Sequence, residues 1–140
     1  MARKTHIKKT SGKKYFFLII FIIYLGVCAY LLFSKGRGTP HVFFIWMASV
    51  LNVKPDKVLH AILFIPIIPL AWVAIRPRNI VTKVLILWSG FIFGVITEIV
   101  QSYLPYCTGD IADVAADIVG SLLGIPFLIL YYWKDKRTTL

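Results

Sequence analysis

Four long apolar segments that contain no lysine or arginine limit what this chain can fold into. They cover about residues 15–33, 58–75, 84–103 and 111–133. Crossing the hydrocarbon core of a bilayer takes about 20 apolar residues in a helix, and each segment comes close to that length. Only 16% of the residues are charged, whereas soluble domains typically carry about 25%. The sequence therefore predicts an all-α membrane protein with four transmembrane helices.

The placement of the basic residues predicts how these segments are oriented. Twelve of the sixteen lysines and arginines lie before the first segment, between the second and third, or after the fourth. Because cytoplasmic loops carry an excess of basic residues, both ends are expected in the cytoplasm, in a cytoplasmic (inner) membrane. This gives a basic cytoplasmic tail over residues 1–14, a membrane domain over 15–133 and a second cytoplasmic tail over 134–140. The loops account for the net charge of +10, so no nucleic-acid partner is expected.

A shorter apolar run covers residues 42–53. If it crossed the membrane, the basic residues would divide evenly between the two sides and the charge bias would disappear. A run of this length is typical of a helix that lies in the membrane interface. We therefore expect a short interfacial or re-entrant helix in the first outer loop, which covers about residues 34–57.

The two cysteines, Cys28 and Cys107, both map toward the outer side of this topology. Cys28 lies within the first apolar segment and below the interface, which disfavours a disulfide between them. We therefore expect Cys28 to be a free, buried thiol.

The acidic residues are concentrated at one predicted membrane surface. Of the six acids, only Asp135 falls on the cytoplasmic side. The other five and one histidine lie at the outer ends of the second, third and fourth segments: Asp56, His60, Glu98, Asp110, Asp113 and Asp117. An ionisable residue within the membrane is costly and therefore marks a candidate functional site. The alternative is that these residues only hydrogen-bond one another and hold the helices together.

Helical spacing places the polar residues of the third and fourth segments on single faces. Residues three or four apart share a face, which aligns Gly90, Gly94, Glu98 and Gln101 in one segment and Asp113, Asp117, Gly120 and Gly124 in the other. Each face contains a G-x-x-x-G pattern, which lets membrane helices approach closely. We therefore expect the two glycine pairs to face each other and to bring Glu98 and Gln101 beside the two aspartates.

The start of the second segment supplies the histidine of this site. Asp56 and His60 are four residues apart and share a face, and Pro66 and Pro69 are expected to interrupt the helix further on. We expect His60 to act as a general acid or base, with Asp56 as its orienting partner. Lys57 is placed to attract an anionic headgroup.

The residue types suggest a division of roles within this site. The candidate catalytic acids or bases are His60, Glu98 and Asp113. The candidate substrate-binding residues are Asp56, Lys57, Gln101, Asp110 and Asp117. The sequence identifies no cofactor, but a divalent cation is compatible with three of the carboxylates, Glu98, Asp113 and Asp117.

Three spaced patterns in this region resemble those of the VanZ-like family. They are Asp56-Lys57-x-x-His60-x-x-x-Phe64, Glu98-x-x-Gln101-x-x-x-Pro105 and Asp110-x-x-Asp113-x-x-x-Asp117-x-x-Gly120-x-x-x-Gly124. The resemblance covers about residues 56–124 and implies a small multi-pass membrane protein. The family's namesake is associated with resistance to teicoplanin, a lipoglycopeptide that acts on cell-wall precursors outside the membrane.

The chain departs from the family pattern at two positions. Cys107 stands where many members have an arginine, which weakens the expectation that this loop binds a phosphate or carboxylate. Asp117 stands where asparagine is common, and the additional acid favours cation or proton binding.

Three functions remain open on the sequence alone. The first is an outward-facing site that acts on or binds a lipid headgroup, a lipid-linked cell-wall intermediate or a lipoglycopeptide-type amphiphile. The second is a non-catalytic protein that organises the membrane, and the third is a small proton- or cation-linked transporter. No G-x-S-x-G or other nucleophile signature identifies a reaction. Membrane lipids are expected partners, and a homo-oligomer is compatible with the sequence.

Overall fold

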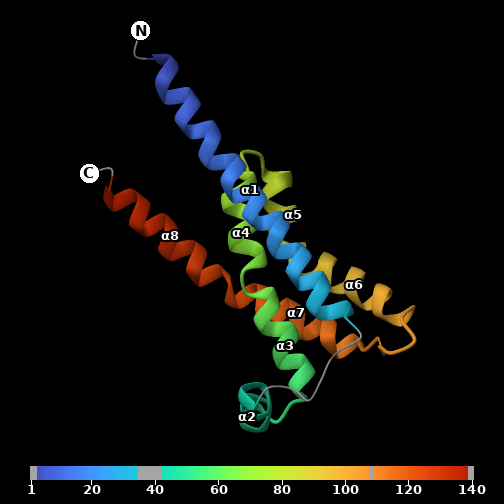
Figure 1. Cartoon of the computed structure of the whole chain (residues 1–140). Coiled ribbons are helices and arrows are strands. Elements are labelled where there is room, and N and C mark those ends of the chain that lie inside the picture. Colours follow the sequence, from blue (N-terminus) through green and yellow to red (C-terminus); the bar gives the residue numbers. More distant parts are fainter. Residues whose placement is uncertain (1–2, 35–41, 108, 139–140) are drawn as a thin grey trace.

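The computed structural model describes the backbone of residues 3–34, 42–107 and 109–138, which form eight helices and no strand (Figure 1). Side chains are described within residues 15–34, 42–107 and 109–133. The helices are α1 (Arg3–Phe33), α2 (Val42–Leu51), α3 (Pro55–Phe64), α4 (Ile67–Ile75), α5 (Ile80–Leu87), α6 (Ser89–Ser102), α7 (Ile111–Leu123) and α8 (Ile125–Thr138). The all-α class predicted from the sequence is confirmed.

Three helical stretches are long and apolar enough to cross a membrane: Tyr15–Phe33, Pro55–Ile75 and Ile111–Trp133. The pair of α5 and α6 is a fourth candidate if it is counted as one span, because its two helices meet at an angle of 49°. The apolar helix α2 has only 10 residues, too few for a crossing. The described residues thus contain three or four candidate spans at the four places that the sequence indicates.

Prolines interrupt the second candidate span as expected. α3 begins with Pro55. Proline is well tolerated there, because the backbone N–H of the first helical residue has no partner within the helix. Pro66 and Pro69 each lack the N–H that would bond the carbonyl four residues back, and α3 ends at Phe64, just before them. The chain continues as α4, which ends where Arg76 adopts a left-handed φ of 54°.

The bend between α5 and α6 falls at Trp88, and α6 begins with Ser89 and Gly90. The hydroxyl of Ser89 donates to the carbonyl of Ile86 at 2.6 Å. A serine that bonds the preceding turn and an adjacent serine–glycine pair both favour a helix bend. The sequence predicts one span over residues 84–103, whereas the structure has two helices that together begin earlier, at Ile80, and bend in between.

The glycines of α6 lie against α7, as the sequence predicts. A Cβ atom on Gly90 would come within 2.0 Å of Ser121 Oγ, and one on Gly94 within 3.0 Å of Asp117 Oδ2. Both neighbours belong to α7. The close approach of α6 and α7 therefore depends on the absence of side chains at these two positions.

The glycines of α7 face a different helix from the one that the sequence predicts. Cβ atoms on Gly120 and Gly124 would lie 2.0 Å from the carbonyl oxygens of Ala61 and Ile65. These glycines thus allow α7 to lie directly against the backbone of α3 and the residue that follows it. The expectation that both glycine pairs meet each other is wrong, because α7 packs against α3 on one side and α6 on the other.

Two apolar clusters fill the interior of the bundle. One is formed by Phe21, Ile68, Ala71, Ala74, Ile86 and Leu128, and the other by Leu32, Phe64 and Ile67. The outer surface of the helices is also apolar, with large side chains such as Ile80 and Ile111 exposed at 71% and 87%. Apolar surface on this scale is typical of a protein that faces lipid or a partner rather than water.

Polar contacts fasten α1 to the other helices. The hydroxyl of Tyr24 donates to the carbonyl of Leu63, and Cys28 Sγ lies 3.8 Å from the same oxygen. Cys28 is buried, and both it and Cys107 are free thiols, in agreement with the sequence analysis. α1 thereby reaches the break between α3 and α4.

The beginning of α1 and the end of α8 lie at the same end of the molecule (Figure 1). The opposite end holds α2, the start of α3 and the connection from α6 to α7. α2 packs against α3, while residues 35–41, which lead into α2, lie outside the described part of the chain. This opposite end is where the predicted polar site falls.

Candidate functional site

The packing of α3 against α7 joins a histidine and an aspartate in the interior. His60 Nδ1 lies 3.0 Å from Asp117 Oδ1, and neither side chain is exposed at all. A carboxylate at Nδ1 favours the tautomer that carries its hydrogen on that nitrogen, which leaves Nε2 as an acceptor. No hydrogen-bond partner for His60 Nε2 is found in the described part of the chain.

The expected pairing of His60 with Asp56 is wrong, because Asp117 occupies the partner position. Asp56 is half-buried in the first turn of α3. Spacing along one helix predicts a shared face, but it does not reveal which residue of a second helix will come closer. Gly120 decides the outcome, since it lets α7 approach α3 so closely that Asp117, one turn away, reaches the imidazole.

Lys57, one turn before His60 in α3, bridges two aspartates. Asp110 immediately precedes α7, and Asp113 lies in its first turn. Lys57 Nζ lies 2.7 Å from Asp110 Oδ2 and 2.8 Å from Asp113 Oδ1. The side chain of Asp113 is 6% exposed, while that of Asp110 is 37% exposed. Lys57 and Asp110 therefore separate the buried part of the site from the end of the bundle.

Asp110 also caps the start of α7. Its Oδ1 accepts a hydrogen bond from the backbone N–H of Ala112 at 3.0 Å, which is the usual role of an N-cap aspartate. The ammonium of Lys57, and then this backbone N–H, hold the pKa of the Asp110 carboxyl below its ordinary value. Asp110 is therefore ionised over the whole physiological pH range.

Glu98 reaches the site from α6. Its Oε2 accepts the backbone N–H of Asp110 at 2.6 Å, which ties the end of α6 to the start of α7. Its other oxygen, Oε1, is buried and has no hydrogen-bond partner among the described residues. Glu98 thus uses one oxygen to hold the loop and directs a second oxygen into the interior.

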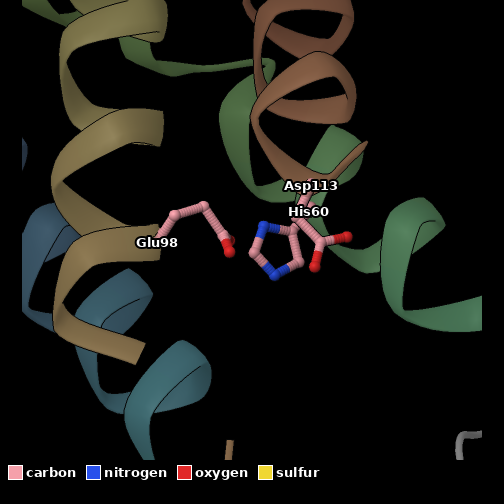
Figure 2. A group of neighbouring side chains, drawn as sticks. All are labelled: His60, Glu98 and Asp113. Atoms are coloured by element: carbon pink, nitrogen blue, oxygen red, sulfur yellow. The ribbon is translucent and has the colours of Figure 1, made fainter. Parts of the chain in front are cut away.

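Three of these side chains converge on one point. One ring nitrogen of His60 and one carboxylate oxygen each of Glu98 and Asp113 all lie within 4.8 Å of one another. Figure 2 shows the imidazole between the two carboxyl groups, with each side chain coming from a different helix. The three residues that the sequence predicts as catalytic are therefore neighbours in space.

Gln101 is buried and contacts α1. Its amide nitrogen donates to the carbonyl of Leu32 at 3.1 Å, so it connects α6 to the end of α1. The sequence predicts Gln101 beside Asp113 and Asp117, and the structure shows a hydrogen bond from its amide nitrogen to α1. Its contact supports the packing of the helices.

A polar cavity that is wide open at the surface, and that the sequence analysis did not predict, lies next to the site, between α2 and α3. Its volume is about 530 Å³, and its lining consists of Ala48, Ser49, Asn52, Val53, Lys54 and Lys57. Lys57 thus faces the cavity and the buried acids together. Asn52, with a left-handed φ of 53°, follows α2, and an asparagine after an apolar helical run is a sequence signal for such a turn.

The fold and site together define a helical bundle with an apolar exterior and an acid–histidine site at one end. Residues 3–134, nearly the whole chain, match the VanZ/LLP1 family. The chain belongs to this family, as its three patterns indicate.

One curated relative shares much of the sequence. It is the "Uncharacterized protein C11E3.10" of Schizosaccharomyces pombe, 34% identical over 116 residues, which are 82% of this chain. The chain covers 64% of that relative's length, slightly less than two thirds. No solved structure matches the chain significantly.

Proposed function

We propose that this protein crosses the membrane four times. At the outer surface it binds or acts on the polar headgroup of an amphiphile, and in this way it protects the cell against teicoplanin or a similar lipoglycopeptide. The observation that carries this proposal is the convergence of five ionisable side chains at one end of the bundle, beside a polar cavity. These side chains come from α3, α6 and α7: Lys57, His60, Glu98, Asp113 and Asp117.

The distribution of polar and apolar side chains supports a position within the membrane. The helices expose large apolar residues along their length, while His60, Gln101, Asp113 and Asp117 are buried. In lipid, polar side chains are expected to face the interior of the bundle and apolar ones the outside. The bent pair of α5 and α6 supplies the fourth crossing, because both of its helices are apolar and consecutive.

The position of the helix ends supports an outward-facing site. The start of α1 and the end of α8 share one end of the molecule, and the acid–histidine site lies at the other (Figure 1). The basic residues near both termini favour the cytoplasm for that end. At the same end, Trp72 Nε1 donates to the Tyr132 hydroxyl at 2.9 Å, and such aromatic residues are typical of the membrane interface.

The polar cavity supports a headgroup as the ligand. Its volume is about 530 Å³, and it is open at the surface, so that a headgroup could enter it directly. Lys54, Ser49 and Asn52 offer hydrogen-bond donors there, and Lys57 connects the cavity to the buried acids. A lipid-borne ligand arrives sideways through the membrane, and the exposed apolar side chains of α2 provide a surface for its acyl chain.

The proposal is tested by expressing the protein in a teicoplanin-sensitive Gram-positive host. Wild type is compared with Glu98→Gln, Asp113→Asn and His60→Ala at quantified membrane levels, against teicoplanin and vancomycin. Asp135→Asn is the matched control, since it removes the one acid outside the outer-end group. We expect wild type and this control to raise the inhibitory concentration of teicoplanin, and the three site variants to lose the effect.

Two results would contradict the proposal. If the site variants protect as well as wild type at equal abundance, the acids and histidine serve only to hold the helices together. If wild type itself gives no protection, the resistance role does not extend to this member of the family.

A further inference from the structure

We propose that His60, Glu98 and Asp113 form a binding site for one divalent transition-metal ion, and that Asp117 positions His60 for this task. The three potential ligand atoms lie within 4.8 Å of one another (Figure 2). They come from α3, α6 and α7, whose approach is fixed by glycines at the contacts. The site is therefore built by the fold and does not depend on a mobile loop.

Two buried atoms of the proposed ligands make no hydrogen bond within the described residues. His60 Nε2 and Glu98 Oε1 lack a hydrogen-bond partner in the part of the chain that the structure describes, and the His60 side chain is fully buried. A buried polar atom without a partner costs free energy, and native proteins rarely leave one. Both atoms carry the lone pairs that a metal ion needs, and their two residues belong to the same cluster.

Asp117 gives His60 the geometry of a metal ligand. Histidines that bind metals usually donate their other ring N–H to a carboxylate, which fixes the tautomer and the ring orientation. Asp117 Oδ1 lies 3.0 Å from His60 Nδ1, so Nε2 is the nitrogen left for a metal. Asp117 is thus a positioning residue, although the sequence alone suggested it as a ligand in place of His60.

The charges of the site favour a cation. The carboxylates of Asp110 and Asp113 contact the ammonium of Lys57, and that of Asp117 contacts His60. Glu98 accepts a hydrogen bond from a neutral backbone N–H. Like charges packed this closely repel one another unless a proton or a cation lies between them. Lys57 offsets part of this charge from the side of Asp110 and Asp113, and an ion between His60 and Glu98 would offset the rest.

The ligand types favour a transition metal. Imidazole suits zinc, iron, copper and nickel, whereas sites for magnesium and calcium consist of oxygen ligands alone. Ligands of a tetrahedral zinc ion with bonds of about 2.1 Å lie about 3.4 Å apart, so the ion would draw the three groups somewhat closer together.

Three protein ligands also leave one coordination position open, as in catalytic zinc sites. A phosphate oxygen of a headgroup could occupy this position. That use of the metal rests on the proposed function, whereas the metal site itself does not.

The test is direct measurement of metal binding by the full-length protein in detergent. The protein is stripped with a chelator, loaded with Zn²⁺, desalted and analysed for zinc by mass spectrometry, while Co²⁺ loading is followed by visible absorption. We expect one zinc ion per chain in wild type and in the control Asp135→Asn, and none in His60→Ala or Glu98→Gln. Asp117→Leu removes the acceptor for His60 and should weaken binding by about 10–100-fold, with partial rescue in Asp117→Asn, which retains a carbonyl acceptor.

The metal content of the wild-type protein and of the two ligand variants decides the proposal. Absence of retained zinc and of a cobalt absorption band would overturn it, as would zinc retention that His60→Ala and Glu98→Gln leave unchanged in folded protein. Retention of calcium or magnesium in preference to zinc would overturn the assignment to a transition metal. Zinc binding without protection from teicoplanin would refute the proposed function and leave the metal site in place.

Discussion

His60 illustrates what a single residue type can and cannot reveal. Its presence among outer-end acids marked it from the sequence as a functional candidate. Its partner could not be assigned in the same way, because Asp117 lies 57 positions away and reaches it only through helix packing. Residue types and spacing thus identify the members of the site, while contacts between helices divide the roles among them.

Asp110 should make stability depend on pH in the acidic range. Its pKa is held below the ordinary value in the folded protein, by Lys57 first of all, so the folded state binds fewer protons there than the unfolded chain. The resulting stabilisation is present above the unfolded pKa of about 3.9 and is lost as pH falls through the lower folded-state value. Asp110→Asn keeps a capping oxygen for Ala112 but removes the charge.

The check is thermal unfolding of both proteins in detergent, measured from about pH 6 to about pH 3. Wild type should be the more stable protein at the upper end, and its advantage should shrink below about pH 4. A difference between the two proteins that stays constant across this range would contradict the assignment.

At the scale of elements, α7 is central because it packs against α3 and α6 together. The sequence predicts that α6 and α7 meet through glycines, and the contacts of Gly90 and Gly94 agree with this. The partner of the second glycine pair could not be predicted, since G-x-x-x-G specifies close approach but not the helix that approaches. The backbone of α3 is that partner, and it determines which acid faces His60.

Gly120→Ala should therefore destabilise the protein. Its Cβ would lie 2.0 Å from the carbonyl oxygen of Ala61, and overpacking of this kind typically costs about 1–3 kcal/mol. Gly26→Ala is the matched control, because a Cβ at Gly26 on α1 would meet nothing within 4 Å. Thermal unfolding should show Gly26→Ala unchanged or up to about 1 kcal/mol more stable. Equal behaviour of the two variants would show that α7 does not lie against α3 in this way.

At the scale of the whole molecule, the start of α1 and the end of α8 lie opposite the acid–histidine site (Figure 1). The charge bias of the sequence predicts which end faces the cytoplasm, and the arrangement of the helices agrees with a common side for both termini. The sequence predicts the interruption at Pro66, which prolines mark, but it does not predict the bend at Trp88. No proline marks the bend at Trp88, where the hydroxyl of Ser89 donates to the carbonyl of Ile86.

Cysteine labelling in intact cells should reveal this orientation. Cys107 is only partly buried, in the loop after α6, whereas Cys28 is buried. We expect a membrane-impermeant maleimide to label Cys107 from outside, and Cys107→Ser to abolish the labelling. In that background, Thr138→Cys near the end of α8 should react only after permeabilisation. The reverse pattern would invert the topology and place the site on the cytoplasmic side.

The sequence by itself determined the helical class, the approximate places of the candidate spans, the family and the acids and histidine of the site. These follow from local properties: apolar length, charge placement and residue spacing along one helix. Only the tertiary structure decided that Asp117 orients His60, that Gln101 belongs to the contact with α1, and that His60, Glu98 and Asp113 converge. These relations join residues far apart in the chain, and they depend on how closely glycines allow one helix to approach another.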